Sequence, residues 1–182
     1  MKPVEIIAQA IGIVAMVFSI LSYQCKHKKR FIAMQLCSGA FFSVNFLLLG
    51  AMVGGILNIL ATIRAVVFLF KEKLKADRLP WFIGFVTLYI TVYILNFTLF
   101  DKELTPYNLI IEVLPVIGLI ALNIGFRLNG TGDIRRWALL SSSSWLFYNI
   151  AAGSWGAIGC EVMSLVSIFI GMLRHDRKAQ NN

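Results

Sequence analysis

Two apolar stretches of this chain each carry an aromatic and a polar residue at the same distance from a glycine. Phe42 lies eight residues before Gly50, and Asn58 lies eight residues after it. The spacing recurs 103 positions later in Trp145, Gly153 and Glu161. If the glycines mark turns between membrane helices, residues eight positions away lie about 12 Å deep, near the middle of a bilayer core of about 30 Å. The four residues other than the glycines are therefore candidate solute-binding groups.

Glu161 carries the most chemical information. A carboxylate near the bilayer midplane costs roughly 2.5–3.5 kcal/mol on insertion scales, so such a group normally faces a partner or a cavity. One interpretation is a solute or proton site, in which ionised Glu161 accepts from a hydroxyl or a cation and protonated Glu161 donates. The other is a structural link between helices. The same two alternatives stand for Asn58, whose amide both donates and accepts, and for the rings of Phe42 and Trp145, which either stack on a solute or pack.

Four further residues could belong to a solute pathway. Asn45, Tyr148 and Asn149 lie about one helical turn outward of the aromatic pair, where we expect an outer vestibule. Arg64 lies six residues after Asn58. It either turns inward as a counter-charge to Glu161 or to an anionic solute, or extends to the lipid headgroups.

The composition places these residues in a membrane protein. Of the 182 residues, 58% are hydrophobic and 14% charged, and the mean hydropathy is +0.77. A soluble globular domain carries about twice that share of charge. The net charge of +8 is confined to short segments between long apolar runs. This distribution is typical of a membrane protein and argues against a nucleic-acid partner.

Seven membrane spans are predicted, each near the length needed to cross a bilayer. They cover residues 5–23, 31–49, 51–70, 81–100, 107–126, 136–153 and 155–173. The segments that follow the first, third, fifth and seventh spans hold 14 of the 17 basic residues, among them Lys28, Lys71, Arg135 and Arg174. By the positive-inside rule, the N-terminus is expected outside and the C-terminus in the cytoplasm.

The spacing repeat predicts an all-α fold built from two like-oriented bundles of three helices, with one helix between them. The first bundle takes residues 1–73, the linking fourth span 74–104, and the second bundle with its tail 105–182. Tight turns at Gly50 and Gly153 would keep the helices within each bundle antiparallel. Repeats of this kind place their binding site between the halves, near the midplane.

This 3+1+3 plan resembles the SWEET and PQ-loop transporter superfamily, and the whole chain resembles the YgjV family of bacterial inner-membrane proteins. In SWEET-type carriers, an aromatic on the second helix of each bundle and an Asn on the third hold the sugar. The resemblance assigns these roles to Phe42 and Asn58 in the first half, and to Trp145 and Glu161 in the second. The chain departs from the pattern where Phe replaces Trp and Glu replaces Asn, and where Tyr23-Gln24 stands for the Pro-Gln dipeptide.

The resemblance implies a carrier that moves a small polar solute by alternating access, with sugar and proton coupling as possibilities. The alternative is a membrane receptor that keeps the fold without transport. An enzyme is not expected, because no nucleophile–base pair or paired carboxylates converge at one depth. His27 and His175 lack the spacing of a metal site, so neither a metal nor a cofactor is expected. The expected partners are membrane lipids and the solute, and the oligomeric state stays open.

Overall fold

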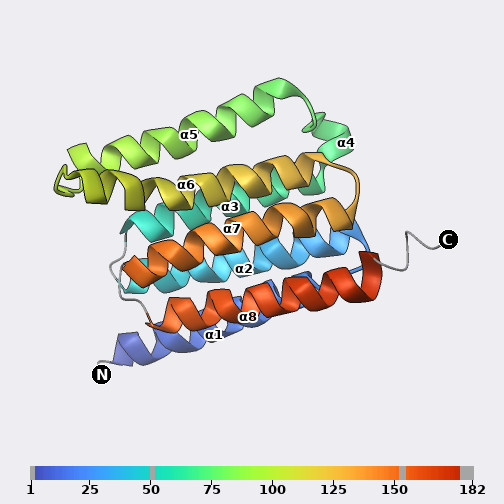
Figure 1. The fold of residues 1–182 in the computed structure, drawn as a ribbon, viewed down its shortest axis with the longest axis horizontal. Helices are drawn as coiled ribbons and strands as arrows, with labels where there is room; N and C mark the ends of the chain where they lie inside the picture. The colour runs from blue at the N-terminus through green and yellow to red at the C-terminus, as the bar shows by residue number, and fades with distance from the viewer. Residues whose placement is uncertain (1–2, 50–51, 152–154, 177–182) are drawn as a thin grey trace.

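The computed structural model describes residues 3–49, 52–151 and 155–176, which form helices joined by turns and contain no strand. Figure 1 shows long helices lying side by side. Their bounds are α1 Pro3–Ser22, α2 Lys28–Leu48, α3 Met52–Leu69, α4 Lys71–Leu74, α5 Leu79–Thr98, α6 Pro106–Arg127, α7 Thr131–Ala151 and α8 Trp155–Gly171, followed by the π-helical turn η1, Met172–Asp176.

Five stretches are long and apolar enough to cross a membrane: α1, α2, α5, α6, and residues Ala157–Asp176 of α8 and η1. The apolar part of α3, Gly54–Leu69, is shorter. Helix α7 has the length, but it carries three charged residues in its first turns and four consecutive serines in its middle. The protein therefore has several membrane-length helices, while seven spans remain a prediction. The predicted turns at Gly50 and Gly153 lie outside the described residues.

Local sequence explains where several helices begin. The hydroxyl of Thr105 accepts from the backbone N–H of Asn108 at 3.1 Å, and Pro106 occupies the first position of α6. Together these features cap the helix and fix its first turn. Helix α5 likewise has a proline in its first turn, after extended Arg78. Helix α7 begins at Thr131, five residues before the predicted span, because its charged residues are helical rather than part of a loop.

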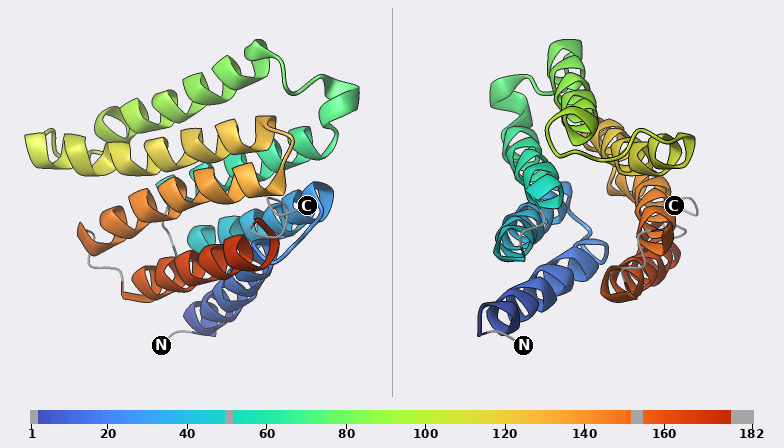
Figure 2. Two further views of the ribbon diagram at one scale, coloured as in Figure 1. Left: turned by 45° about the vertical axis from the view of Figure 1, so that its right-hand side comes forward. Right: turned by 90° about the vertical axis from the view of Figure 1, so that its left-hand side faces the viewer.

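Six of the long helices form a closed ring. Helix α2 contacts α1 and α3, helix α7 contacts α6 and α8, and the two rows meet where α3 contacts α6 and α1 contacts α8. Figure 2 (right) shows the first three helices on one side and the last three on the other. Helix α5 lies outside this ring against α3 and α6.

Glycines allow close approach within each row. A Cβ built on Gly12 of α1 would lie 2.9 Å from the amide nitrogen of Asn45 on α2. A Cβ on Gly118 of α6 would lie 3.0 Å from the indole of Trp145 on α7. In both rows, a glycine on the first helix thus receives a large side chain from the second. These two contacts do not follow the predicted offset of 103 positions, since Gly118 lies 106 positions after Gly12 and Trp145 lies 100 positions after Asn45.

One end of the ring holds the α1–α2, α3–α5 and α6–α7 turns, the C-terminal turn η1 and most of the charged residues. This basic end comprises residues 23–28, 70–78, 127–136 and 172–176 (Figure 1). Just inside it, Tyr23, Phe31, Phe126 and Phe68 form a chain of edge-to-face contacts with centroids 5.6, 6.4 and 5.8 Å apart. Arg135, which the sequence analysis placed in the segment after the fifth predicted span, lies in α7, and its side chain is fully buried.

Candidate functional site

The six helices of the ring all line one partly open cavity of about 160 Å³. Phe42 from α2 and Asn58 from α3 line it from the first row. Trp145 from α7 and Glu161 from α8 line it from the second. All four candidate binding residues therefore surround one space, with two contributed by each half of the chain.

Asn58 is held in place by its own helix. Its side-chain nitrogen donates to the carbonyl of Gly54 at 2.9 Å, and its own carbonyl accepts from the Thr62 hydroxyl at 2.8 Å. The first of these bonds uses one of the two N–H donors of the amide. An Asn positioned in this way can still offer a donor and an acceptor to a solute.

Glu161 lies among hydroxyl groups rather than cations. The side chain of Ser142 on α7 is its hydrogen-bonding neighbour, and Ser164, one turn further along α8, lines the same cavity. Within residues 3–49, 52–151 and 155–176, the ion pairs are Lys102–Glu112, Arg135–Asp176 and Arg136–Asp133. A carboxylate that faces this cavity and forms no ion pair among the described residues suits a group that binds a solute or a proton.

Arg64 also lines the cavity and is 3% exposed. Its Nη1 donates to the carbonyl of Leu119 at 2.9 Å and reaches the Tyr89 hydroxyl at 3.4 Å. The guanidinium carbon lies 5.0 Å from the centre of the Phe126 ring, a cation–π contact. Its Nε–H is buried with no acceptor among the described residues. A buried donor without an acceptor costs about 1–3 kcal/mol.

The structure separates the three residues expected in an outer vestibule. Asn149 is buried and lines the cavity. Tyr148 packs edge-to-face on Trp145, with centroids 5.8 Å apart, and does not line the cavity. Asn45 donates to the carbonyl of Ala8 at 2.7 Å and so joins α2 to α1. Tyr148 and Asn45 therefore pack around the cavity and do not line it.

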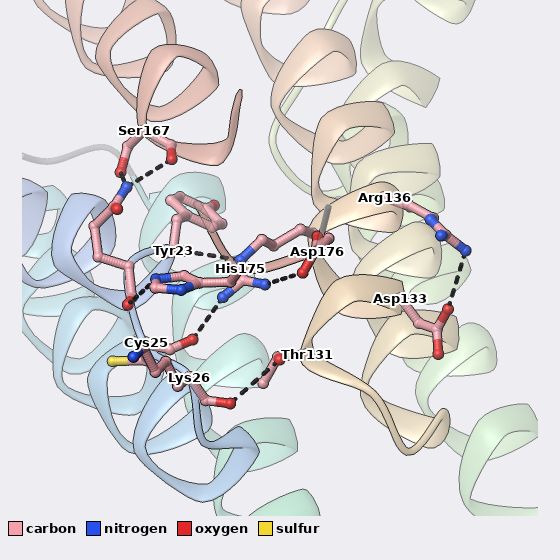
Figure 3. A network of polar contacts seen from close by, with 11 residues as sticks. Tyr23, Cys25, Lys26, Thr131, Asp133, Arg136, Ser167, His175 and Asp176 are labelled. Carbon is pink, nitrogen blue, oxygen red and sulfur yellow. Dashed lines mark hydrogen bonds and ion pairs between the residues drawn. The ribbon is translucent and has the colours of Figure 1, made fainter. Parts of the chain in front are cut away.

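A polar network closes the basic end and contains residues that the sequence interpretation missed (Figure 3). Arg135 donates to the carbonyls of Tyr23 at 2.9 Å and Cys25 at 2.6 Å, and pairs with Asp176 at 2.6 Å. Gln24 donates to the carbonyl of Ser167 at 2.7 Å and to its hydroxyl at 2.9 Å. These bonds join the end of α1 to α7, α8 and η1, and so connect the two rows.

The one sequence signal for this network is Tyr23-Gln24, which stands where the resemblance expects Pro-Gln. Arg135 gave no such signal, because a basic residue beside a turn is typical of positive-inside charge. His175, which we considered only as a metal ligand, lies 3.1 Å from the carbonyl of Gln24. Gln24, Arg135 and His175 hold backbone segments together and do not line the cavity, whereas Tyr23 does line it.

The cavity is suited to binding by hydrogen bonds and ring contacts. Its wall alternates hydroxyls and amides with the rings of Phe42, Phe46, Phe126 and Trp145. A volume of about 160 Å³ is enough for several waters or one small solute, since one water needs roughly 10–15 Å³ on this measure. It is below the roughly 300–1,000 Å³ of pockets for drug-sized ligands.

Membrane-length apolar helices, packed around a polar interior, define a multi-pass membrane protein. Comparison with protein families gives the chain a more specific place: residues 6–179 match the family Imp-YgjV, described as bacterial inner membrane protein. The chain belongs to this family, so its expected place in the bacterial inner membrane is supported. No curated protein and no solved structure matched it.

Proposed function

We propose that this protein carries a small polar solute across the bacterial inner membrane by alternating access. The observation behind this proposal is the cavity lined by Phe42 and Asn58 from one row and by Trp145 and Glu161 from the other. A site shared between two rows of helices can change its exposure when one row tilts against the other. All seven long helices cross the membrane in this proposal, with the basic end in the cytoplasm.

The groups around the cavity restrict the chemistry of the solute. Glu161 can accept from a hydroxyl or an ammonium group, and the amide of Asn58 can both donate and accept. Trp145 and Phe42 provide ring faces for an apolar edge. A compact solute with both donors and acceptors fits this set, and sugars and small amino acids are the two classes to test. A carboxylate in the cavity also offers a place for a coupled proton.

Access from the basic end requires that the network in Figure 3 be broken. Arg135 and Gln24 hold the end of α1 to α7 and α8 there. We therefore assign the structure to a state closed at this end. The transport cycle would alternate between this state and one in which these inter-row bonds are lost.

The test is uptake into liposomes that contain the purified protein, with a panel of labelled sugars and amino acids. Wild-type protein should accumulate at least one solute, and Glu161→Gln should alter the pH dependence of its uptake. The double variant Asn58→Ala, Glu161→Ala should abolish uptake. Thr91→Ala is the matched control, because Thr91 is on α5, outside the cavity, and bonds only within its own helix. The carrier proposal fails if the wild type takes up no solute of the panel. It also fails if no solute raises the unfolding temperature of the wild type more than that of the double variant.

A receptor without transport is the second candidate. The inter-row bonds of Arg135 and Gln24 favour it, since they hold the rows together. It predicts that a solute stabilises the wild type against thermal unfolding while liposome uptake stays at the level of empty vesicles. Binding without uptake would decide for the receptor.

A further inference from the structure

A second cavity, of about 360 Å³, lies at the basic end, away from the central one. It is formed by the start of α2, the junction of α3 with α4, and the turn between α6 and α7 (Figure 1). Its lining includes four lysines and one carboxylate: Lys28, Lys29, Lys71, Lys73 and Glu72. The excess of cations indicates a site for an anion.

Two of the lysines are fixed by the end of α6. Lys28 donates to the carbonyls of Phe126, at 2.8 Å, and Leu128. Lys71 donates to the carbonyl of Arg127 at 2.5 Å and to the side-chain oxygen of Asn129 at 2.9 Å. The last carbonyls of a helix lack partners within it and carry partial negative charge, so both ammonium groups are stabilised there. Each ammonium has three N–H donors, so one donor remains on each for a ligand.

The other two lysines extend the positive surface outward. Lys29 and Lys73 are exposed, and they approach the cavity from α2 and α4 respectively. No ion pair of either lysine occurs in the described part of the chain. Their charges are therefore available to a ligand, whereas Lys28 and Lys71 set the floor of the site.

The remaining wall of the cavity is apolar. Ile32 and Phe68 are buried among the helices of the six-helix ring, whereas Phe70 is 52% exposed. Phe70 follows directly on α3, so in a bilayer its ring lies at the border between headgroups and acyl chains. A charged floor beside an exposed apolar ring matches a molecule with a phosphate at one end and hydrocarbon at the other.

We propose that this cavity binds the phosphate of an anionic phospholipid, with Lys29 and Lys73 as its main contacts and an acyl chain along Phe70. Basic pockets between membrane helices on the cytoplasmic side take such headgroups. A zwitterionic lipid is disfavoured, because its choline ammonium would lie among four lysines. The bound lipid would connect α2 and α4 of the first half to the α6–α7 turn of the second half. Asn129 is the residue of this turn that lines the cavity.

The experiment titrates phosphatidylglycerol into the purified protein in mixed micelles of a neutral detergent and phosphatidylcholine and follows thermal unfolding. A ligand that binds the folded state raises the unfolding temperature by mass action. We expect phosphatidylglycerol to do so. Each lysine near a lipid surface contributes a factor of about five in affinity. Lys29→Gln with Lys73→Gln should thus weaken the apparent affinity about thirtyfold, and each single variant about fivefold.

The matched control is Lys26→Gln with Lys75→Gln. These exposed lysines belong to the same end and their loss removes the same charge, but they do not line the cavity. Because Lys26 and Lys75 lie outside the cavity, this double variant should lose clearly less affinity for phosphatidylglycerol than Lys29→Gln with Lys73→Gln does. An equal loss in both double variants would mean diffuse surface charge and would overturn the site. Stabilisation by inorganic phosphate alone, equal to that by phosphatidylglycerol, would overturn the lipid as its ligand.

Discussion

Arg135 and Arg136 are neighbours in sequence but have opposite environments. The side chain of Arg135 is fully buried, and it bonds two backbone carbonyls and Asp176. Arg136 is 61% exposed and reaches Asp133 within its own helix at 3.4 Å. An exposed pair contributes little to stability, while removing one partner of a buried pair is costly. Position on the helix, and not residue type, decides which arginine holds the rows together.

Arg135→Met should therefore lower the free energy of unfolding by about 3 kcal/mol, since it leaves two buried carbonyls and a carboxylate without their donor. Arg136→Met, the matched control, should change it by less than about 1 kcal/mol. Denaturant-induced unfolding of the purified protein in detergent measures both. Equal effects of the two substitutions would contradict the role assigned to Arg135.

At the residue scale, the sequence identified the residues that line the cavity better than the residues that close the basic end. Phe42, Asn58, Trp145 and Glu161 stood out because a duplicated spacing marked them, and they line one cavity. Gln24 and Arg135 act through backbone carbonyls of segments distant in sequence, as in the bond from Arg135 to Tyr23. No local pattern predicts such a bond, because it depends on how the helices pack. For Arg64, whose direction was left open, the structure supplies the buried contacts with Leu119 and Phe126.

Among the elements, α6 and α7 depend on close contact at a glycine. A Cβ on Gly118 would lie 3.0 Å from the Trp145 indole and 3.2 Å from the carbonyl of Ser141. The indole can shift, but the backbone of α7 cannot shift without moving the helix. Gly84 on α5 is the contrasting case, because a Cβ there would meet nothing within 4 Å.

We expect Gly118→Ala to destabilise the protein by about 1–3 kcal/mol through overpacking and to displace Trp145 from the cavity. Gly84→Ala should be neutral or stabilise by up to about 1 kcal/mol, because alanine is the better helix former. Thermal unfolding measures the stability, and the emission of Trp145 in a variant with the other tryptophans replaced by Phe reports on the indole. A neutral Gly118→Ala with unchanged emission would show that the α6–α7 contact is looser than the structure indicates.

Element boundaries were predictable where hydropathy changed and not where charged residues are helical. Helices α5 and α6 begin within two residues of their predicted spans, with a proline in the first turn of each. Helix α7 begins five residues early, because Asp133, Arg135 and Arg136 are part of its first turns. Hydropathy alone treats such residues as loop, whereas the contacts of Arg135 with the end of α1 stabilise them in a helix.

At the scale of the whole molecule, the orientation in the membrane can be tested at Cys25. This thiol lies between α1 and α2 at the basic end and is partly exposed. Burial raises the pKa of the Cys25 thiol, against the opposing effect of Arg30 and Arg135. The thiolate is the reactive form, so less of it is present at neutral pH than for a free cysteine.

A variant that keeps Cys25 as its only cysteine should react with a membrane-impermeant maleimide from the cytoplasmic side only. The reaction should be slower at pH 7 than in the unfolded protein, and the difference should shrink as the pH rises through the raised pKa. Labelling of intact cells compared with inverted membrane vesicles measures the side. Labelling from the periplasm would reverse the orientation proposed here.

The central claim is that the cavity opens to water on both sides of the membrane in turn, and Cys160 on its wall tests this directly. The measurement is modification of a variant with Cys160 as its only cysteine by a membrane-impermeant thiosulfonate, applied to either face of reconstituted vesicles. The carrier account predicts modification from both faces, slowed by the transported solute. Modification from neither face, or from one face alone, would contradict it.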